Sequence, residues 1–223
     1  IGSEKHPIWC SWHDGQKRHF GFVSLSSISA GIRNGLSFYT PLIPHPSFTK
    51  SELKTISGVI ITEQIGYLLG ALVGDGCLGG ITKGQSIEFS NVDQVCIHAV
   101  YEAVKSLGGQ LVRSDLFRRA DHRIVGCKVL RKLLVEIGLD CGSYHKRVPD
   151  CIIESPKPVI CAFLRGLFDT DGTAEKTGHV NFCTTSEHLG LDVQSILSAF
   201  GILAVRKPRK TASGKQTWNL SLF

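Results

Sequence analysis

Residues 163–172 read Phe-Leu-Arg-Gly-Leu-Phe-Asp-Thr-Asp-Gly, and residues 67–76 read Tyr-Leu-Leu-Gly-Ala-Leu-Val-Gly-Asp-Gly. Both stretches are apolar with a helical spacing, and both end in Asp-Gly. Taken alone, Asp-Gly after an apolar run is a common signal for a turn or a helix end. Because it occurs twice in similar surroundings, it indicates an internal repeat, and this repeat decides the fold.

The sequences that follow the two stretches match as well. A β-prone segment follows each stretch, and a predicted helix comes after it. Nineteen residues separate Phe89 in the first β-prone segment from Gly108 at the end of the first helix, and nineteen separate Phe182 from Gly201. Each repeat is therefore predicted to contain a helix, a hairpin, a second helix and a basic strand region, which makes the chain α+β with pseudo-twofold symmetry.

Small residues recur on one face of each predicted motif helix. Gly70 and Gly74 lie four residues apart in the first, and Gly166 and Thr170 take the equivalent places in the second. A glycine inside a helix costs about 1 kcal/mol relative to alanine, so these glycines imply a compensating role in packing. We expect the two helices to touch backbone to backbone around the pseudo-twofold axis.

Such a contact would bring two acids side by side, Asp75 and Asp171, at the ends of the two helices. Two carboxylates in one small site repel each other, which raises the pKa of one of them unless divalent cations neutralise the pair. Oxygen ligands of this kind suit Mg²⁺. Lys and Arg number 25 against 19 Asp and Glu, for a net charge of +6. Paired carboxylates, a divalent metal and a basic chain together suggest phosphodiester hydrolysis by metal-activated water.

The composition excludes several classes of protein. With 223 residues, 42% of them hydrophobic, the chain can bury a core without disulfides or a structural metal. Its eight cysteines form no Cys-x-x-Cys pair and its histidines have no ligand spacing, so we expect reduced thiols, a cytoplasmic protein and no zinc site. The longest apolar stretches, residues 65–74 and 159–168, are too short to span a membrane, and no signal peptide is recognised.

Residues 1–60 differ from the rest of the chain. Short β-prone runs are followed by turns and by Pro41, Pro44 and Pro46, which cannot lie inside a helix or a central strand. We expect a small β-rich segment with an extended connector at 1–60, a first repeat at 61–150 and a second repeat at 151–223. The second repeat is short at its C-terminal end, and since the chain contains no Met we expect it to be a fragment.

Residues 68–76 and 164–172 resemble the nine-residue signature of the LAGLIDADG homing endonucleases, of the single-chain, two-motif type found inside inteins. The resemblance covers roughly residues 60–223, and residues 36–44 are similar to intein sequence. It implies two αββαββα repeats that form a DNA-binding saddle, with one antiparallel sheet per repeat in the major groove. It also implies a monomer that uses Mg²⁺ to cut double-stranded DNA at a long asymmetric site, across the minor groove.

The resemblance assigns roles to the ends of both motifs. The last acid of each, Asp75 and Asp171, would hold roughly two or three shared divalent ions. The residues just before these acids, Gly74 and Thr170, can offer their backbone carbonyls. The sixth motif position, which is acidic in the family name, is matched by Asp169 in the second motif only.

A lysine upstream of the second motif is a further family element, matched here by Lys146 in the sequence His-Lys-Arg-Val-Pro. The resemblance implies that Lys146 lies near the scissile phosphate or its water. Without the resemblance, a solvated loop lysine is the preferred interpretation. The equivalent position in the second repeat falls beyond Phe223, so the partner lysine is either supplied in another way by Lys215 or missing.

Basic residues gather in the strand regions of both repeats, where they would neutralise phosphates and make binding salt-sensitive. Alternating residues of the strands at 111–117 and 216–221 would present one face to DNA, where Arg and Gln can read base edges. Since the repeats differ in nearly every polar position, an asymmetric target follows. The basic residues of the first repeat form one cluster, for which a solvated charged face is the alternative interpretation. The basic residues of the second repeat form another cluster, which also contains Arg206. The expected DNA contacts are Arg113, Arg118, Arg119, Arg123, Lys207, Arg209, Lys210, Lys215 and Gln216.

Two other functions fit the same fold. A LAGLIDADG protein that does not cleave, such as an RNA-splicing maturase or a DNA-binding regulator, would be favoured by motifs that lack the acids. Both acids are present here, which favours the nuclease. An intein remnant that has lost its activity is the third possibility.

Overall fold

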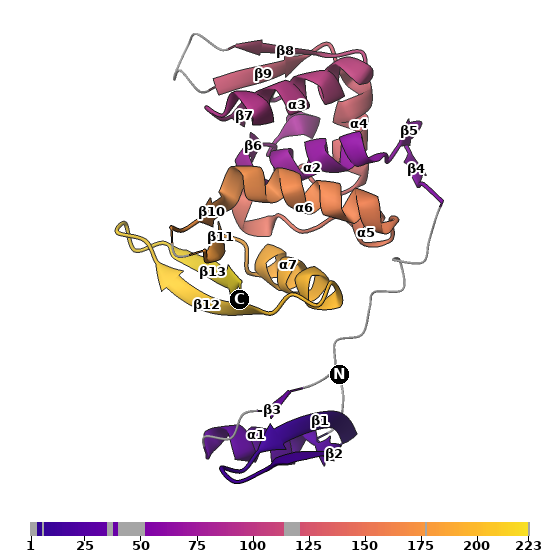
Figure 1. Cartoon of the computed structure of the whole chain (residues 1–223). Helices are drawn as coiled ribbons and strands as arrows, with labels where there is room; N and C mark the ends of the chain where they lie inside the picture. Colours follow the sequence, from indigo (N-terminus) through magenta and orange to yellow (C-terminus); the bar gives the residue numbers. More distant parts are fainter. Residues whose placement is uncertain are drawn as a thin grey trace. The chain divides into compact units, whose positions relative to one another are not determined.

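The computed structural model describes residues 4–5, 7–34, 38–39, 52–113, 121–176 and 178–222. The chain divides into two compact units, 1–43 and 44–223 (Figure 1). The division between the units lies at residues 43 and 44, and the predicted boundary at residue 60 stays a prediction of where the first repeat begins. The hairpin of β4 (Thr55–Ile56) and β5 (Val59–Ile60) belongs to the larger unit, where the Lys54 Nζ lies 2.7 Å from the Glu154 Oε2.

The described residues of the N-terminal unit form a small antiparallel sheet and one helix. Its strands β1 (Pro7–His13), β2 (Arg18–Ser24) and β3 (Phe38–Tyr39) lie in the order β2-β1-β3. The helix α1 (Leu25–Arg33) begins after Ser24, whose hydroxyl oxygen accepts a hydrogen bond from the Ser27 amide. The strands agree with the expected β-rich segment, whereas α1 was not expected, because its serine-rich sequence suggests turns.

The first repeat has the element order αββαββα and one antiparallel sheet with the strand order β6-β7-β9-β8. The short 3₁₀ turn η2 (Ile81–Lys83) lies inside its first hairpin region. The elements are α2 (Glu63–Asp75), β6 (Gly76–Cys77), β7 (Ile87–Ser90), α3 (Gln94–Ser106), β8 (Gln110–Arg113), β9 (Asp121–Val125) and α4 (Lys128–Glu136).

The second repeat follows a connector that contains η3 (Ser143–His145) and α5 (Asp150–Ile153). Its sheet has the order β10-β11-β13-β12, the same order as in the first repeat. This confirms the predicted α+β architecture of two related halves, and through Leu222 the second half shows the order αββαββ. The elements are α6 (Lys157–Asp171), β10 (Gly172–Ala174), β11 (Val180–Thr184), α7 (Glu187–Ala199), β12 (Ala204–Lys210) and β13 (Gln216–Leu222).

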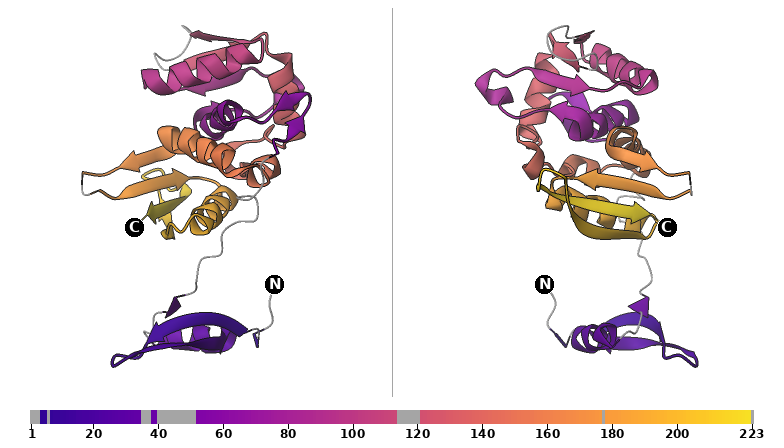
Figure 2. Two further views of the ribbon diagram at one scale, coloured as in Figure 1. Left: turned by 45° about the vertical axis from the view of Figure 1, so that its right-hand side comes forward. Right: turned by 90° about the vertical axis from the view of Figure 1, so that its left-hand side faces the viewer.

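Helices α2 and α6 form the centre of the larger unit, with the sheet of one repeat on each side of the pair (Figures 1 and 2). Their backbones are in direct contact: a Cβ added to Gly70 would overlap the carbonyl oxygen of Phe163, and one added to Gly166 would overlap that of Tyr67. A Cβ on Gly66 would lie only 2.8 Å from the Val159 carbonyl oxygen. The predicted glycine contact is therefore confirmed.

The hydrophobic core runs through both repeats and includes Phe89 and Phe182, the paired positions of the repeat, each 0% exposed. In the first repeat Cys127, the residue before α4, packs against the end of α3, where its Sγ lies 3.6 Å from the Leu107 carbonyl oxygen. The corresponding end of α7, at Phe200, lines an open apolar hollow of about 280 Å³.

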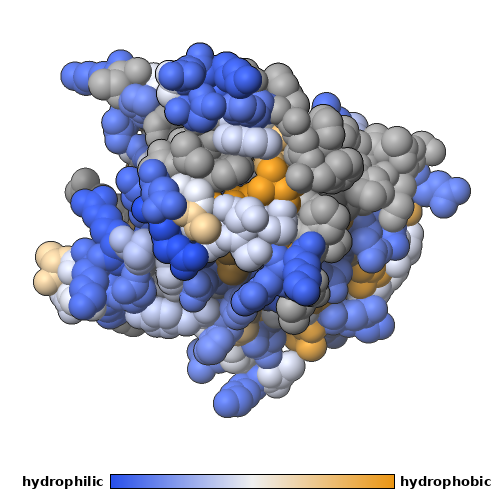
Figure 3. All heavy atoms as spheres, turned by 90° about the horizontal axis from the view of Figure 1, so that it is seen from below, coloured by the Kyte–Doolittle hydropathy of each residue, from blue (hydrophilic) through white to orange (hydrophobic). Residues whose placement is uncertain are grey.

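Figure 3 shows one face on which hydrophilic residues predominate and hydrophobic ones form only small patches. Among the residues described, none of the helices combines the length and apolarity needed to cross a bilayer. All eight cysteines are free in the structure.

Candidate active site

The two repeated motifs place their final acids at corresponding helix ends. Asp75 is the last residue of α2 and Asp171 the last of α6, and each helix ends at a glycine, Gly76 or Gly172, in extended conformation. Because the helices touch through their glycines, the two ends meet. A Cβ added to Gly74, the neighbour of Asp75, would lie 3.6 Å from the carboxyl carbon of Asp171, so the structure brings the two predicted acids together.

Asp171 is an ionisable group held in an unfavourable setting. Burial is the main cause that raises its pKa to about 6, the charge of Asp75 adds to the rise, and the positive charge of Lys146 opposes it. Among the described residues none donates a hydrogen bond to this carboxylate. A half-buried anion without a donor beside a second anion is an electrostatic environment that a cation would stabilise.

Asp75 differs from Asp171 because it has a hydrogen-bond donor. The Asn91 Nδ2 donates to the Asp75 Oδ2 at 2.8 Å, and the Asn91 Oδ1 in turn accepts from the Asp93 amide at 2.8 Å. Burial raises the pKa of Asp75, while the Asn91 hydrogen bond and the charge of Lys146 lower it. The two acids are thus inequivalent, and Asn91 fixes the orientation of one of them.

Lys146 is buried beside both acids rather than solvated in a loop. Its side chain is bound at the C-terminal end of α2, where the Nζ donates to the carbonyl oxygens of Val73 at 2.7 Å, Gly76 at 2.9 Å and Gly74 at 3.2 Å. Lys146 is only 5% exposed, and burial lowers its pKa, although nearby anions, Asp171 foremost, oppose that shift. The ammonium therefore neutralises the negative end of α2 as well as lying near the acids.

The other two predicted metal ligands lie at the same helix ends. The Gly74 carbonyl already accepts from Lys146, and the Thr170 hydroxyl donates within its own helix to the carbonyls of Leu167 at 2.8 Å and Gly166 at 3.1 Å. A cleft of about 210 Å³ opens beside Asp171 toward the second sheet. Its lining consists of Val73, Gly74, Ser143, Lys146, Asp171, Cys183, Thr184, Thr185 and Thr217.

The donor set fits a divalent cation that is only partly enclosed by protein. Two carboxylates and nearby carbonyl oxygens are hard ligands suited to Mg²⁺. Within the described ranges no group of three or more His, Cys, Asp or Glu could hold a metal by itself. Water and substrate oxygens would have to complete the coordination, which is how Mg²⁺ is commonly bound next to phosphates.

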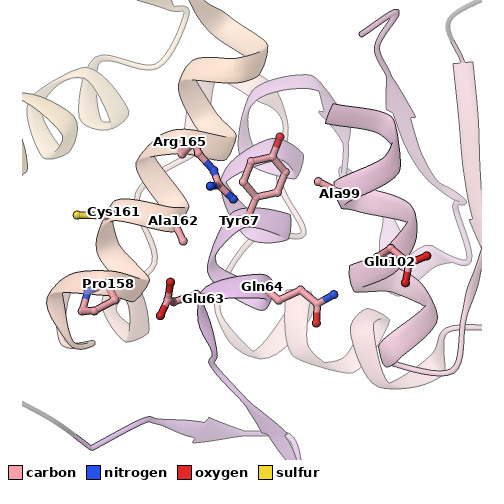
Figure 4. Close-up of a pocket in the computed structure, with 9 residues that line it drawn as sticks. All are labelled: Glu63, Gln64, Tyr67, Ala99, Glu102, Pro158, Cys161, Ala162 and Arg165. Atoms are coloured by element: carbon pink, nitrogen blue, oxygen red, sulfur yellow. The ribbon is translucent and has the colours of Figure 1, made fainter. Parts of the chain in front are cut away.

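The acid at the sixth position of the second motif serves another purpose. The Tyr67 hydroxyl donates to the Asp169 Oδ2 at 2.8 Å, and the Arg165 guanidinium lies 4.8 Å from the centre of the Tyr67 ring. Figure 4 shows Arg165 beside Tyr67 at a cavity of about 470 Å³ between α2, α3 and α6. Asp169 thus helps to join the two helices.

The second sheet carries basic residues on its outer face. Phe182 and Leu220 pair on the inner face under α7, so the alternating residues Lys207 and Arg209 of β12 lie on the outer one. Lys210, Lys215 and Gln216 are exposed at the end of the same hairpin.

Arg206 does not belong to this basic face, which corrects the expectation from the sequence. It pairs with Leu220 on the inner side, its guanidinium lies 4.2 Å from the centre of the Trp218 ring, and its Nη1 is 3.5 Å from the Glu187 Oε1. The run of basic residues in the sequence does not show which of them lie on the inner face, because successive residues of a strand point to opposite faces of the sheet.

The first sheet carries a different charge pattern. Arg123 lies on the outer face but its guanidinium is 3.2 Å from the Glu88 Oε1, and Arg113 is exposed at the end of β8. Arg118 and Arg119 lie outside the described residues. Two of the DNA contacts predicted for the first repeat are thus described by the structure, Arg113 and Arg123. Of these two, Arg113 is the one that is exposed and makes no ion pair.

Two polar residues at the site were missed from the sequence, Asn91 and Ser186. Both lie in the short turn between a strand and the next helix: Asn91 accepts from the amide of Asp93, and Thr184 accepts from the amide of Ser186 at 3.1 Å. Asn91 and Thr184 are separated by the same number of residues as Phe89 and Phe182, and so are Asp93 and Ser186. This repeated spacing is the signal in the sequence that could have identified Asn91 and Ser186.

In the metal-free protein, stability should fall as the pH rises from about 4 to about 6. The folded state binds the Asp171 proton more tightly than the unfolded chain, because its pKa is about 6 instead of the ordinary 3.8. The stabilisation is complete below about pH 4 and is lost through about pH 6, amounting to about 3 kcal/mol. Urea unfolding in EDTA at several pH values, compared with Asp171→Asn, isolates this contribution. Parallel stability profiles for the two proteins would contradict the assignment.

Comparison with known proteins places the chain by its sequence. Residues 158–223 match the LAGLIDADG-like domain family. The DNA gyrase A protein of Mycobacterium gordonae is 31% identical over 156 residues, 62% of this chain and 26% of that protein. The replicative DNA helicase DnaB of Synechocystis is 28% identical over 179 residues (72% and 20%), and the DNA polymerase of Thermococcus litoralis 25% over 186 residues (78% and 10%). The chain thus spans about a quarter or less of each of these relatives.

Comparison with solved structures places the fold. The homing endonuclease I-DmoI in complex with DNA and Mn superposes with a TM-score of 0.51 at 17% identity, covering 73% of this chain and 90% of that one. An I-DmoI variant bound to its nicked target DNA gives 0.54 at 15% identity, with 73% and 89% covered. Residues 158–223 therefore form a LAGLIDADG-like domain, and over 73% of its length the chain shares the fold of the homing endonuclease I-DmoI.

Proposed function

We propose that this chain is a site-specific homing endonuclease that makes metal-dependent double-strand cuts at a long, asymmetric DNA site. The observation that carries the proposal is the meeting of Asp75 and Asp171, one from each repeat, at the touching ends of α2 and α6. Each half of the fold contributes one acid to a shared centre. Such an arrangement suits a substrate with two scissile phosphates.

Asp75 and Asp171 would hold the Mg²⁺ ions, with the carbonyl oxygens of Gly74 and Thr170 as further ligands. When bound, Mg²⁺ would activate water and stabilise the charge that develops on the phosphate. Asn91 orients the Asp75 carboxylate through its 2.8 Å hydrogen bond. Lys146 maintains a positive charge beside both acids, although its ammonium donates its hydrogen bonds to backbone carbonyls.

Double-stranded DNA is the partner that the outer faces of the sheets suit. The second sheet offers Lys207 and Arg209 with Asn181, Asn219 and Ser221 beside them, a mixture of cationic, amide and hydroxyl groups that can contact phosphates and base edges. The first sheet presents a salt-bridged Arg123–Glu88 pair instead. Because the two faces differ, the target would be asymmetric, and one chain with both repeats would act as a monomer.

An intein context is supported by the nature of the relatives. A gyrase, a helicase and a DNA polymerase have different activities by name, yet each is similar to this chain over about a quarter of its length or less. A segment shared by otherwise different proteins is what an inserted, mobile element would produce. We therefore place the chain inside an intein.

A cleavage assay on a randomised duplex library tests the proposal. The full chain is incubated with Mg²⁺, and the ends produced are sequenced, with EDTA and the Asp75→Asn/Asp171→Asn double variant as controls. Metal-dependent double-strand breaks with short 3′ overhangs at one asymmetric sequence are expected. Selective DNA or RNA binding without any cutting would favour the non-cleaving alternative, a maturase or regulator.

Lys207→Ala and Arg209→Ala should each weaken DNA binding and reduce the salt dependence of binding by about one counterion. Both residues lie on the outer face of the second sheet, and neither forms an ion pair with a carboxylate of the described residues. The slope of log Kd against log salt measures the effect. Lys105→Ala on α3, whose side chain is 62% exposed, is the matched control and should leave the slope unchanged. Equal slopes for all four proteins would place the DNA elsewhere.

A further inference from the structure

The connector that carries Lys146 is fastened to α7 of the second repeat. The Ser186 Oγ donates to the Lys146 carbonyl oxygen at 2.6 Å. The next two residues are held by one acid: the Arg147 guanidinium contacts both oxygens of Asp192, at 2.8 and 3.1 Å, and the Val148 amide donates to its Oδ2 at 3.2 Å. Three consecutive residues of the connector are therefore anchored to one helix.

Ser186 is built into this anchor with all its polar atoms in use. It is 0% exposed, and its hydroxyl oxygen accepts from the Leu189 amide at 3.2 Å as the N-cap of α7. Its own amide donates to the Thr184 Oγ1 at 3.1 Å. The single hydroxyl proton is thus left for the Lys146 carbonyl.

The side chain of Lys146 reaches in the opposite direction. Its ammonium binds the carbonyls at the end of α2, in the first repeat, next to Asp75. The backbone of Lys146 is thus fixed by the second repeat, while its ammonium group lies against the first repeat. A shift of the backbone carbonyl would move the ammonium relative to both acids.

We infer that Ser186 is a positioning residue that sets the location of the Lys146 ammonium by anchoring its backbone to α7. The effect on cleavage rests on the proposed nuclease function, whereas the effect on the lysine itself does not. The competing interpretation is that Ser186 only caps a helix. Asp93 makes that interpretation testable, since it is the N-cap of α3 at the corresponding place of the first repeat and accepts from the Val95 amide at 2.8 Å. Among the described residues, the hydrogen bonds of the Lys146 ammonium go to backbone carbonyls and none goes to Asp93.

The experiment compares Ser186→Ala with Asp93→Ala in the full chain. Each removes one N-cap of a helix of the same length, so each should lower the Tm by about 2–4 °C. The readout for positioning is the rate at which an amine-acetylating reagent modifies Lys146, measured by peptide mass spectrometry relative to exposed Lys105. We expect Ser186→Ala to raise that ratio at least about fivefold, because the released connector exposes the ammonium, and Asp93→Ala to leave it unchanged.

Two further variants sharpen the result. Ser186→Thr retains the hydroxyl and should restore slow acetylation, and Asp192→Ala, which removes the other anchor, should raise the ratio as Ser186→Ala does. On cleavable DNA, Ser186→Ala should lower the single-turnover rate at least about tenfold with an unchanged Kd. Equal acetylation of Lys146 in wild type, Ser186→Ala and Asp192→Ala overturns the inference, as does an equal rise in Asp93→Ala. If the wild type cuts no DNA, the nuclease proposal fails, while the acetylation ratio still decides the role of Ser186.

Discussion

Asp171→Asn is expected to reduce double-strand cleavage by about three orders of magnitude while DNA affinity stays nearly unchanged. The substitution keeps the shape of the side chain but removes the charge that, together with Asp75, would hold the cation. Asp171 has no hydrogen-bond donor among the described residues, so the neutral amide leaves no partner behind. Single-turnover cleavage in Mg²⁺ and the Kd in EDTA measure the two quantities separately.

Asp169→Asn is the matched control for this substitution. It changes an acid two residues away on the same helix, whose carboxylate accepts from the Tyr67 hydroxyl and does not act on Asp75 or Asp171. An asparagine can still accept that hydrogen bond, so cleavage should persist. Undiminished double-strand cutting by Asp171→Asn, or equal losses in both variants, would refute the assignment of the centre.

Gly70→Val should destabilise the chain by about 3 kcal/mol or more and abolish cleavage. Even the first added carbon would overlap the Phe163 carbonyl oxygen and lie 2.9 Å from the Leu167 amide nitrogen, both of which are rigid backbone. The helices would have to separate, and the separation would carry Asp75 and Asp171 apart. Urea unfolding gives the stability change, and metal-dependent cleavage reports on the site.

Gly190→Ala supplies the opposite case within the same protein. Gly190 also lies inside a helix, but an added Cβ would meet only side-chain atoms at ordinary distances, Arg206 Cδ at 3.4 Å and Leu220 Cδ1 at 3.5 Å. The higher helix propensity of alanine should then stabilise the chain by about 0.5–1 kcal/mol. A stabilising effect at Gly70, or equal effects at both positions, would show that the α2–α6 contact is looser than described.

The sequence was sufficient for the architecture and for the acid pair because both follow from a motif that occurs twice. A helix with glycines four residues apart, seen in two copies, specifies a backbone contact, and the contact brings Asp75 and Asp171 together without further information. Likewise, the equal spacing from Phe89 to Gly108 and from Phe182 to Gly201 located the elements of both repeats.

What the sequence did not indicate depends on contacts between residues far apart in the chain. Lys146 binds carbonyls of residues 72–76, and nothing near position 146 shows that the lysine is buried. Arg206 stacks on Trp218 because the hairpin register places both on the inner side of the sheet, which a run of basic letters cannot reveal. Asn91 and Ser186 are intermediate cases, since the turns before α3 and α7 recur with the repeat: Asn91 corresponds to Thr184, and the N-cap Ser186 corresponds to the N-cap Asp93.

The anchoring of residues 146–148 on α7 has a consequence for protein engineering. Chimeras that join the halves of two such proteins, made to combine their recognition sequences, need a crossover point. The connector lies between the motifs and its lysine serves the end of α2, so a cut just before α6 is the obvious choice. In this chain, a crossover just before α6 would separate Lys146 from its own α7 and place its backbone against the α7 of the other protein. A crossover ahead of η3 would transfer Lys146 together with Ser186 and Asp192, and would keep the contacts between the connector and α7 intact.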